Sequence, residues 1–423
     1  MAGPIPTRLL PDTAAISADG RLRIGGCDLV DLAGEYGTPL FVYDEAHLRA
    51  RCREAVTAFG DGVAYASKAF LCDAMARLAH EEGMHLDVAT GGELFVALRA
   101  GVPADRLVMH GNNKSDAELA MALDEGVGRI VVDSFDELDR LDAIATATGS
   151  RPRVLLRITP GVEAHTHEFI ATGQDDSKFG FTASSGLATA AVERAIASDS
   201  VELVGLHAHI GSQVFEVGAF ARAIEVLIDF AAPFGLAELS VGGGLGVPYV
   251  EGESAPSITE WASGIRAVCE AAGVTASVSA EPGRAIVAAA AITLYTVGTI
   301  KDLPGIRTYV AVDGGMSDNP RPVLYGSGYE TFLPRATAAE RSRPVRVVGK
   351  HCESGDLLVR EGWVPDDLVV GDVLATPVTG AYGHAMGSNY NHVLRPAVVF
   401  VADGDARTVV RRETFEDLVR REV

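Results

Sequence analysis

A lysine stands at the end of a stretch that otherwise reads as a buried β-strand. In "VAYASKAF", residues 63–70, Val63, Tyr65 and the alanines suit a packed strand, whereas Lys68 does not. A buried ammonium group is costly and tends to lose its proton. An amine in such a place is suited to forming a Schiff base with a carbonyl group. Position alone favours a surface lysine whose charged head reaches solvent.

Other polar residues also follow short β-rich runs, and a glycine run, "GGGLG" at 242–246, follows one of them. Glycines allow backbone N–H groups to approach phosphate oxygens closely, although a glycine run alone is more often a tight turn. Singly, each polar residue also has an ordinary explanation, such as a satisfied core histidine or a helix N-cap partner. The polar residues at the ends of these runs are Asp87, His110, Arg157, His207, His209 and Glu281 to Arg284.

A lysine, a histidine, an acid and a phosphate-binding loop on one face predict pyridoxal phosphate. Lys68 would form the Schiff base with the cofactor. Glu281 would pair with the pyridine nitrogen and keep it protonated, because a protonated ring is the stronger electron sink. The interpretation depends on a fold that brings these residues together.

The middle of the chain alternates β-rich runs with Ala- and Leu-rich helical patterns. Such alternation predicts right-handed βαβ units and a parallel sheet. Eight units favour a closed (β/α)₈ barrel over an open doubly wound sheet, and in a barrel the carboxyl ends of all strands share the catalytic face. We expect the barrel over residues 41–288. The runs begin at residues 63, 85, 107, 129, 153, 203, 236 and 275.

The sequence pattern changes after about residue 290, where Gly, Asp and Pro separate the β-rich runs and long helical patterns are few. This pattern predicts a second, mostly antiparallel β domain over 289–423. Residues 1–40 have the same pattern, and we expect this N-terminal segment to join that domain.

Composition argues against several classes of protein. The 423 residues are 48% hydrophobic, enough for a sizeable core, and carry a net charge of −21, which disfavours nucleic acid and anionic membranes as partners. We find no apolar run of signal-peptide or membrane-span length. The five cysteines are scattered and lack metal-site spacing, so we expect free thiols, a cytoplasmic location and no metal.

Longer motifs carry a resemblance to a known family. They occur in the order "AYASKA", "HLDVATGGEL", "HGNNKS", "RITPGVEAHTHEFIATGQDDSKFGF", "HAHIGSQ", "VGGGLG", "EPGRAIV", "VDGGMSDNPRPVLY", "CESGD" and "TGAYGHAMGSNYN". This ordered, nearly full-length set resembles the pyridoxal-phosphate-dependent decarboxylases of the alanine-racemase-like fold. "DGGMSDNPRPVLY" together with "CESGD" is similar to their diaminopimelate branch.

The resemblance implies roles for residues at the matching positions. Lys68 would be the Schiff-base lysine, His209 would stack on the cofactor, Glu281 would contact the pyridine nitrogen, and Cys352 would protonate the carbanion after CO₂ leaves. Further cofactor contacts would fall at Asp87, Ser212, Gly243, Gly244, Gly283, Arg284 and Tyr382. Substrate contacts would fall at Arg284, Arg321, Tyr325, Glu353 and Tyr382.

The same resemblance implies decarboxylation of meso-2,6-diaminopimelate to L-lysine, the last step of lysine biosynthesis, by a homodimer whose "CESGD" loop reaches the partner's site. The distal carboxylate of this substrate needs a fixed cation, and arginine binds carboxylates bidentately. Arg321 is the more telling residue, because "EPGR" also occurs in branches that act on ornithine.

Two alternatives remain open. One is a related decarboxylase acting on ornithine, arginine or an unusual amino acid of a secondary pathway. The other is a paralogue that binds the cofactor without catalysis, which the presence of both Lys68 and Cys352 disfavours; a racemase would lack the "CESGD" acid. The chain departs from the family pattern at Phe70, His384 and Gly387, residues that bear on the substrate rather than on the cofactor.

Overall fold

The computed structural model describes residues 2–162 and 173–423. The central part of the motif "RITPGVEAHTHEFIATGQDDSKFGF", residues 163–172, lies outside the described residues. No helix within the described ranges combines the length and the apolar character that crossing a membrane requires.

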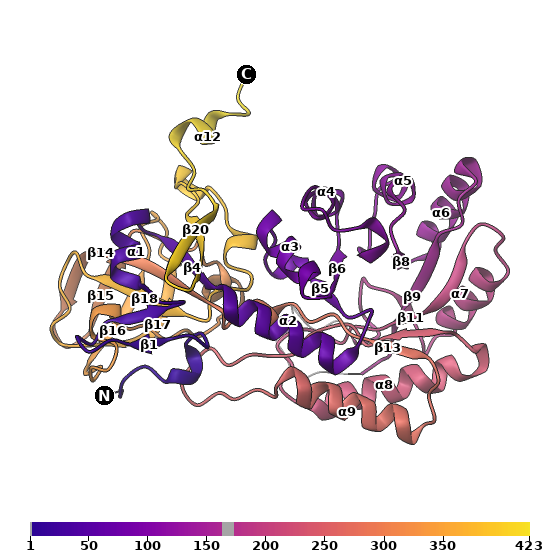
Figure 1. The fold of residues 1–423 in the computed structure, drawn as a ribbon, viewed down its shortest axis with the longest axis horizontal. Coiled ribbons are helices and arrows are strands. Elements are labelled where there is room, and N and C mark those ends of the chain that lie inside the picture. The colour runs from indigo at the N-terminus through magenta and orange to yellow at the C-terminus, as the bar shows by residue number, and fades with distance from the viewer. Residues whose placement is uncertain (1, 163–172) are drawn as a thin grey trace. The chain divides into compact units, whose positions relative to one another are not determined.

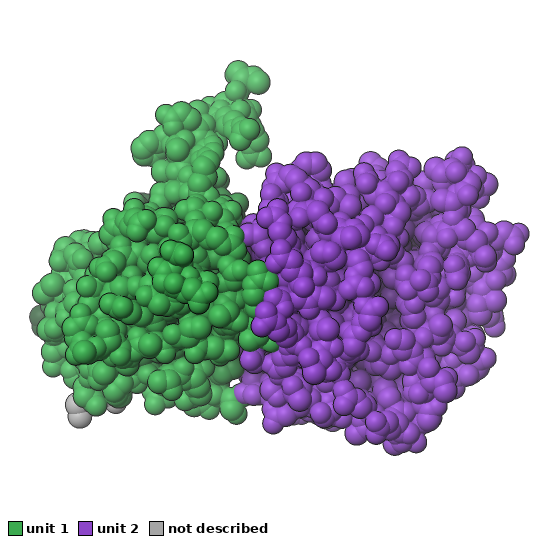
Figure 2. Space-filling model, viewed as in Figure 1, with its two compact units in different colours: residues 1–50, 248–254, 286–423 green, residues 51–247, 255–285 purple. Residues whose placement is uncertain are grey.

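The chain forms two compact units, coloured separately in Figure 2. The barrel unit comprises residues 51–247 and 255–285, and the β unit comprises residues 1–50, 248–254 and 286–423. The division into a barrel domain at 41–288 and a β domain at 1–40 and 289–423 stays a prediction.

The barrel unit is built on eight parallel strands, as the sequence pattern predicted. Their order is β13-β12-β11-β9-β8-β7-β6-β5, and the short β10 pairs with β9. Backbone N–H groups of Ala64 and Ala66 donate to the carbonyls of Ala280 and Pro282, which joins the two end strands. The strands are β5 (Ala64–Ala66), β6 (His85–Val88), β7 (Leu107–Met109), β8 (Arg129–Val132), β9 (Arg153–Thr159), β10 (Phe181–Thr182), β11 (Glu202–His207), β12 (Glu238–Ser240) and β13 (Ser277–Ser279).

Helices follow the strands and lie outside them (Figure 1). Helix α5 shows why the sequence begins and ends a helix where it does. Ser115 and Glu118 cap its N-terminus reciprocally, and Gly126 ends it in the left-handed conformation at φ 76°. The helices of this part of the chain are α2 (Glu45–Phe59), α3 (Asp73–Glu81), α4 (Gly91–Arg99), α5 (Asp116–Glu125), α6 (Phe135–Thr148), α7 (Leu187–Ile196), α8 (Val217–Ala231), α9 (Ile258–Ala271) and α10 (Arg284–Val287).

A layer of small and branched side chains fills the barrel interior. Ala64, Val108, Val131, Leu155 and Val204 come from five strands and form one buried cluster. Fully burying a valine or leucine stabilises the fold by about 1.5–3 kcal/mol. The interior is therefore a packed core, and polar chemistry is confined to the strand ends.

The β unit contains a mixed sheet of order β17-β16-β15-β14-β4-β19-β20, with β18 also paired to β14, and a three-stranded sheet β1-β2-β3. A strand near the N-terminus joins this sheet: β4 begins at the last residue of the 1–40 segment and pairs with β14 and β19. The strands are β1 (Ala15–Ile16), β2 (Leu22–Ile24), β3 (Cys27–Asp28), β4 (Leu40–Asp44), β14 (Ala291–Leu303), β15 (Arg307–Val312), β16 (Arg343–Val348), β17 (Leu357–Val364), β18 (Val373–Pro377), β19 (Ala397–Ala402) and β20 (Asp405–Val410). The helices are α1 (Leu29–Tyr36), α11 (Arg321–Tyr325) and α12 (Phe415–Val419).

Candidate active site

Glu281 lies at the centre of the polar cluster on the catalytic face of the barrel. It follows β13, and two neighbouring strands supply its partners. Its Oε2 is 2.9 Å from Nε2 of His207, the last residue of β11, and its Oε1 accepts a hydrogen bond of 2.9 Å from Ser240, the last residue of β12. Burial raises the pKa of this carboxyl, but the imidazoles of His207 and His110 outweigh burial and hold the pKa well below its ordinary value.

His110 extends this cluster to the next acid. It follows β7, and its Nε2 lies 3.1 Å from Asp87 Oδ1 and 3.5 Å from Glu281 Oε1. Neither contact has the direction of a hydrogen bond, so both are electrostatic. Burial raises the pKa of Asp87 to about 7, against the lowering effect of His110. The ligand atoms of His110, His207 and Glu281 lie within 4.8 Å of one another, a spacing that could also suit a metal ion.

His209 has a defined tautomer. The backbone N–H of Gly243 donates to its Nδ1 over 3.1 Å, so a neutral ring carries its proton on Nε2. Burial, together with the charges of Lys68 and Arg157, lowers the pKa of His209 well below its ordinary value. The neutral aromatic ring is suited to stacking, and the Gly243 N–H serves this histidine.

Lys68 is exposed, although its neighbours Ser67 and Ala69 are buried. The exposed position agrees with a surface lysine at a strand end: the strand β5 ends before Lys68, and a single 3₁₀ turn, η2 (Ser67–Ala69), turns the lysine outward. Its positive charge still acts on Asp87 and His209, which places the amine beside the polar cluster.

The loops after the last barrel strands form a cradle of donors. Arg284, buried, donates through Nη2 to Ser212 Oγ over 2.8 Å. Gly244 has φ +116°, and a Cβ there would lie 2.2 Å from the Gly211 carbonyl; a Cβ at Gly283 would lie 2.9 Å from that of Ala66. Only glycine fits these positions.

These residues fit a phosphorylated pyridine. A hydroxyl, a guanidinium and glycine backbone are donors that bind phosphate. An ionised Glu281 suits a protonated ring nitrogen, a neutral His209 suits the ring face, and Lys68 suits a carbonyl carbon.

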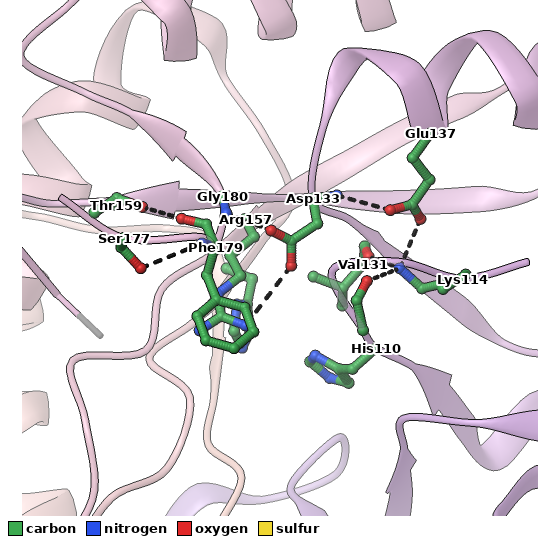
Figure 3. A network of polar contacts seen from close by, with 12 residues as sticks. His110, Lys114, Val131, Asp133, Glu137, Arg157, Thr159, Ser177, Phe179 and Gly180 are labelled. Atoms are coloured by element: carbon green, nitrogen blue, oxygen red, sulfur yellow. Dashed lines mark hydrogen bonds and ion pairs between the residues drawn. The ribbon is translucent and has the colours of Figure 1, made fainter. Parts of the chain in front are cut away.

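A second buried network stands beside this cluster (Figure 3). Lys114 Nζ lies 2.6 Å from Glu137 Oε1 and donates to the carbonyls of Gly111 and Val131. The other Glu137 oxygen accepts the backbone N–H of Asp133 over 3.2 Å. The ion pair thus ties the loop after β7 to α6, and the hydrogen bonds to Val131 and Asp133 tie both to the end of β8.

Asp133 carries this network to Arg157 on β9. Its carboxylate accepts the backbone N–H of Gly180 and lies 3.7 Å from the Arg157 guanidinium, which stands 4.2 Å over the ring of Phe179 (Figure 3). Burial lowers the pKa of Arg157, and the charges of Asp133, Glu281 and Asp87 oppose that lowering. Arg157 therefore belongs to the electrostatics of the catalytic face.

Arg321 belongs to the β unit and is held by three neighbours. Its Nη1 donates to the Tyr329 hydroxyl over 2.6 Å, its Nη2 donates to Ser327 Oγ over 3.0 Å, and its guanidinium carbon stands 3.9 Å over the ring of Tyr249. Its side chain is buried, and the partners that the structure describes for it are hydroxyls and aromatic rings rather than a carboxylate.

The loop that carries Cys352 is tied down within the same unit. Cys352 is exposed, and its backbone N–H donates to Asn391 Oδ1 over 3.2 Å. Asp356 accepts backbone N–H groups of Met316 and His351, at 2.7 and 2.8 Å. Asn391 and Asp356 therefore join the "CESGD", "DGGMSD" and "SNYN" segments.

The other predicted substrate contacts also lie in the β unit. Tyr325 ends α11, Tyr382 has a positive φ of 58°, and Glu353 is exposed and accepts the N–H of Gly355. The structure thus brings together the predicted barrel residues in one unit and the substrate residues, apart from Arg284, in the other. Arg284, bonded to Ser212, lies with the donor cradle.

The three residues that depart from the family pattern, Phe70, His384 and Gly387, each pack against identifiable neighbours. Phe70 is fully buried, and its carbonyl accepts the Tyr65 hydroxyl over 2.6 Å. His384 packs edge-on against Phe41, and burial lowers its pKa to about 4, so it acts as a neutral aromatic ring. A Cβ at Gly387 would lie 3.2 Å from the His384 carbonyl, which favours glycine there.

The sequence reasoning assigned no role to several residues that the structure brings into the site. His110, His207 and Arg157 were noted at strand ends only. Their position there, next to an assigned acid, was the available signal. Asn391 ends the motif "TGAYGHAMGSNYN" and had no role assigned to it. Those with no preceding signal are Ser240, Tyr249, Tyr329 and Ser327.

Comparisons with known proteins agree with this geometry. A sequence model described as "Pyridoxal-dependent decarboxylase, pyridoxal binding domain" matches residues 45–288. The chain is 51% identical to diaminopimelate decarboxylase of Mycobacterium tuberculosis H37Rv, over 96% of this chain and 95% of that protein. It is 46% identical to diaminopimelate decarboxylase of Bacillus subtilis 168, over 97% of each. Its fold is similar to the crystal structure of the M. jannaschii diaminopimelate decarboxylase in complex with L-lysine, with TM-score 0.90, 32% identity, and coverage of 97% and 98%.

Proposed function

The chain belongs to the pyridoxal-dependent decarboxylase family, on its diaminopimelate decarboxylase branch, and from this premise we propose that it converts meso-2,6-diaminopimelate to L-lysine and CO₂. The substrate assignment rests on Arg321, whose buried guanidinium has no carboxylate among its described neighbours. A buried cation needs a counter-charge. The distal carboxylate of diaminopimelate supplies one, and ornithine and lysine have none.

Pyridoxal 5′-phosphate is the cofactor of this family, and the barrel residues would hold it. Lys68 would bind its aldehyde carbon covalently, His209 would cover one ring face, and Glu281 would hold the ring nitrogen. When bound, the cofactor supplies an electron-withdrawing ring that stabilises negative charge on the substrate α-carbon. We assign Asp87 to the cofactor cluster, and the phosphate to Ser212, Gly244, Gly283, Arg284 and Tyr382, with Gly243 supporting His209.

The residues of the β unit would handle substrate and protons. Arg321 would orient the distal carboxylate, Glu353 would hold the distal ammonium, and Tyr325 would line the substrate. Cys352 of the partner subunit would give its thiol proton to the α-carbon after CO₂ leaves. We therefore propose a homodimer with shared active sites, acting in the cytoplasm, where the free thiols of this chain would stay reduced.

The test is CO₂ release from meso-diaminopimelate, lysine, ornithine and arginine, compared in wild type, Arg321→Ala and the control Arg343→Ala. Arg343 also lies in the β unit but pairs with Asp302. Arg321→Ala should lower kcat/KM for diaminopimelate by about a hundredfold to a thousandfold, because the distal carboxylate loses its counter-charge. Lysine should be a poor substrate of both wild type and Arg321→Ala. The control Arg343→Ala should have the same kcat/KM for diaminopimelate as wild type. A wild type that prefers ornithine or lysine would refute the assignment.

A further inference from the structure

Three adjacent strands converge on the carboxylate of Glu281. β13, β12 and β11 are neighbours in the barrel, and their ends bring Glu281, Ser240 and His207 together. Each carboxylate oxygen has its own partner, Ser240 on Oε1 and His207 on Oε2. The carboxylate is therefore fixed in orientation, and only 8% of the residue is exposed.

His207 has one polar link, and that link goes to the acid. Its Nδ1 is buried and has no hydrogen-bond partner among the described residues, whereas its Nε2 lies 2.9 Å from Glu281 Oε2. A carboxylate can only accept, so the proton sits on Nε2 and the histidine donates. Among the residues that the structure describes, the carboxylate of Glu281 is therefore the hydrogen-bond partner of this histidine.

His110 adds a second imidazole to the same acid. Its ring stands edge-on to that of His207, with centroids 4.9 Å apart, and its Nε2 lies between Asp87 and Glu281. The titratable and charged groups that face this cluster from the surrounding elements are Lys68, Asp87, Glu93, His110, Arg157, His207 and His209.

We propose that His207, supported by His110, is a positioning residue that keeps Glu281 an oriented carboxylate for the ring nitrogen of the cofactor. The proposal rests on the proposed function for its cofactor. A buried carboxyl without such neighbours favours its neutral form, which could not hold a protonated ring nitrogen as an ion pair. Removing the His207 donor would take away one of the two imidazoles that stabilise the carboxylate against burial, so Glu281 would take up a proton more readily as the pH falls.

The experiment measures retention of pyridoxal phosphate by the full-length holoenzyme in equilibrium dialysis at pH 6, 7, 8 and 9. His207→Leu removes the donor. His207→Gln keeps an N–H near the position of Nε2 and is the matched control. We expect His207→Leu to weaken retention about tenfold to a hundredfold, with the gap widening as the pH falls, and His207→Gln to restore most of it. Equal retention by wild type and His207→Leu at every pH would overturn the proposal.

A double-mutant cycle separates this role from a general structural one. In a Glu281→Gln background there is no carboxylate to hold ionised, so His207→Leu should cause no further pH-dependent loss. Additive losses in the double variant would overturn the proposal, as would a stoichiometric zinc ion bound by His110, His207 and Glu281 in the purified protein. Failure of wild type to bind pyridoxal phosphate would instead refute the proposed function itself.

Discussion

Arg321 keeps a full positive charge at a position where 3% of the residue is exposed. Two hydroxyl groups and the ring of Tyr249 replace part of its hydration, and the ring lies on one face of the guanidinium. The hydroxyls fix the direction of its N–H groups, and the ring fixes its plane. The residue is thereby prepared to bind a planar carboxylate with little loss of side-chain entropy.

Replacing Tyr249 tests this preparation. Tyr249→Leu removes the ring beneath the guanidinium and should raise KM for diaminopimelate about tenfold, since a partly desolvated cation–π contact is worth about 1–2 kcal/mol. Tyr249→Phe keeps the ring and should stay near wild type. The measurement is the steady-state KM for diaminopimelate in wild type and both variants. Equal KM values for Tyr249→Leu and wild type would show that the ring does not position Arg321.

Lys68 provides the second prediction at this scale. It is exposed beside Asp87 and His209, where its amine is accessible to a carbonyl carbon. Lys68→Ala should abolish turnover while some cofactor remains bound through the phosphate donors. The measurement is CO₂ release together with cofactor content after dialysis. Normal turnover by Lys68→Ala would end the pyridoxal phosphate assignment.

At the scale of elements, the segment between β15 and α11 is organised around a buried acid, Asp318. The Tyr295 hydroxyl donates to its Oδ1 and the Gly315 N–H to its Oδ2, both over 2.7 Å. Burial nevertheless raises the pKa of Asp318 from 3.8 to about 7. The segment that leads to Arg321 is thus held by a carboxyl that titrates near neutral pH.

This titration predicts a pH-dependent stability. Because the pKa of Asp318 is higher in the folded than in the unfolded state, its contribution is fully present below about pH 4 and is lost as the pH rises through about 7. Asp318→Asn cannot titrate, so the Tm advantage of wild type over this variant should shrink between pH 5 and 8. Tyr295→Phe keeps the carboxyl and should keep the wild-type trend. A constant difference in Tm across this range would contradict the prediction.

At the scale of the whole molecule, the proposed function takes its proton donor from a second chain. Cys352 is exposed within its own chain, and its loop is held by Asn391 and Asp356 rather than left free. A rigid, exposed thiol is suited to entering a neighbouring subunit's site.

Mixing two inactive variants tests the shared site. A hybrid dimer of Lys68→Ala and Cys352→Ala would hold one site with both residues intact. At equal mixing about a quarter of wild-type activity should return, because half of the dimers are hybrids and each has one working site. Subunit exchange is verified with differently tagged chains, and exchange without any recovery would refute the shared site.

The sequence by itself determined the barrel and its catalytic face. The eight β-rich runs became β5 to β9 and β11 to β13, because strand and helix periodicities are local properties of the chain. Since parallel strands point the same way, residues at run ends such as Lys68, Asp87 and Glu281 had to share a face. Capping signals such as Ser115 and Gly126 likewise set helix ends without tertiary information.

Only the tertiary structure decided which partners these residues meet and what charge they carry. No spacing along the chain pairs Glu281 with His207 or Arg321 with Tyr249, since their separations depend on how distant segments pack. Lys68 could have been buried with its strand or exposed at the strand end, and one 3₁₀ turn after β5 leaves it exposed. Protonation follows from burial and neighbouring charges, which act over a few ångströms in space, so the contrast between the pKa values of Asp87 and Glu281 exists only in the folded protein.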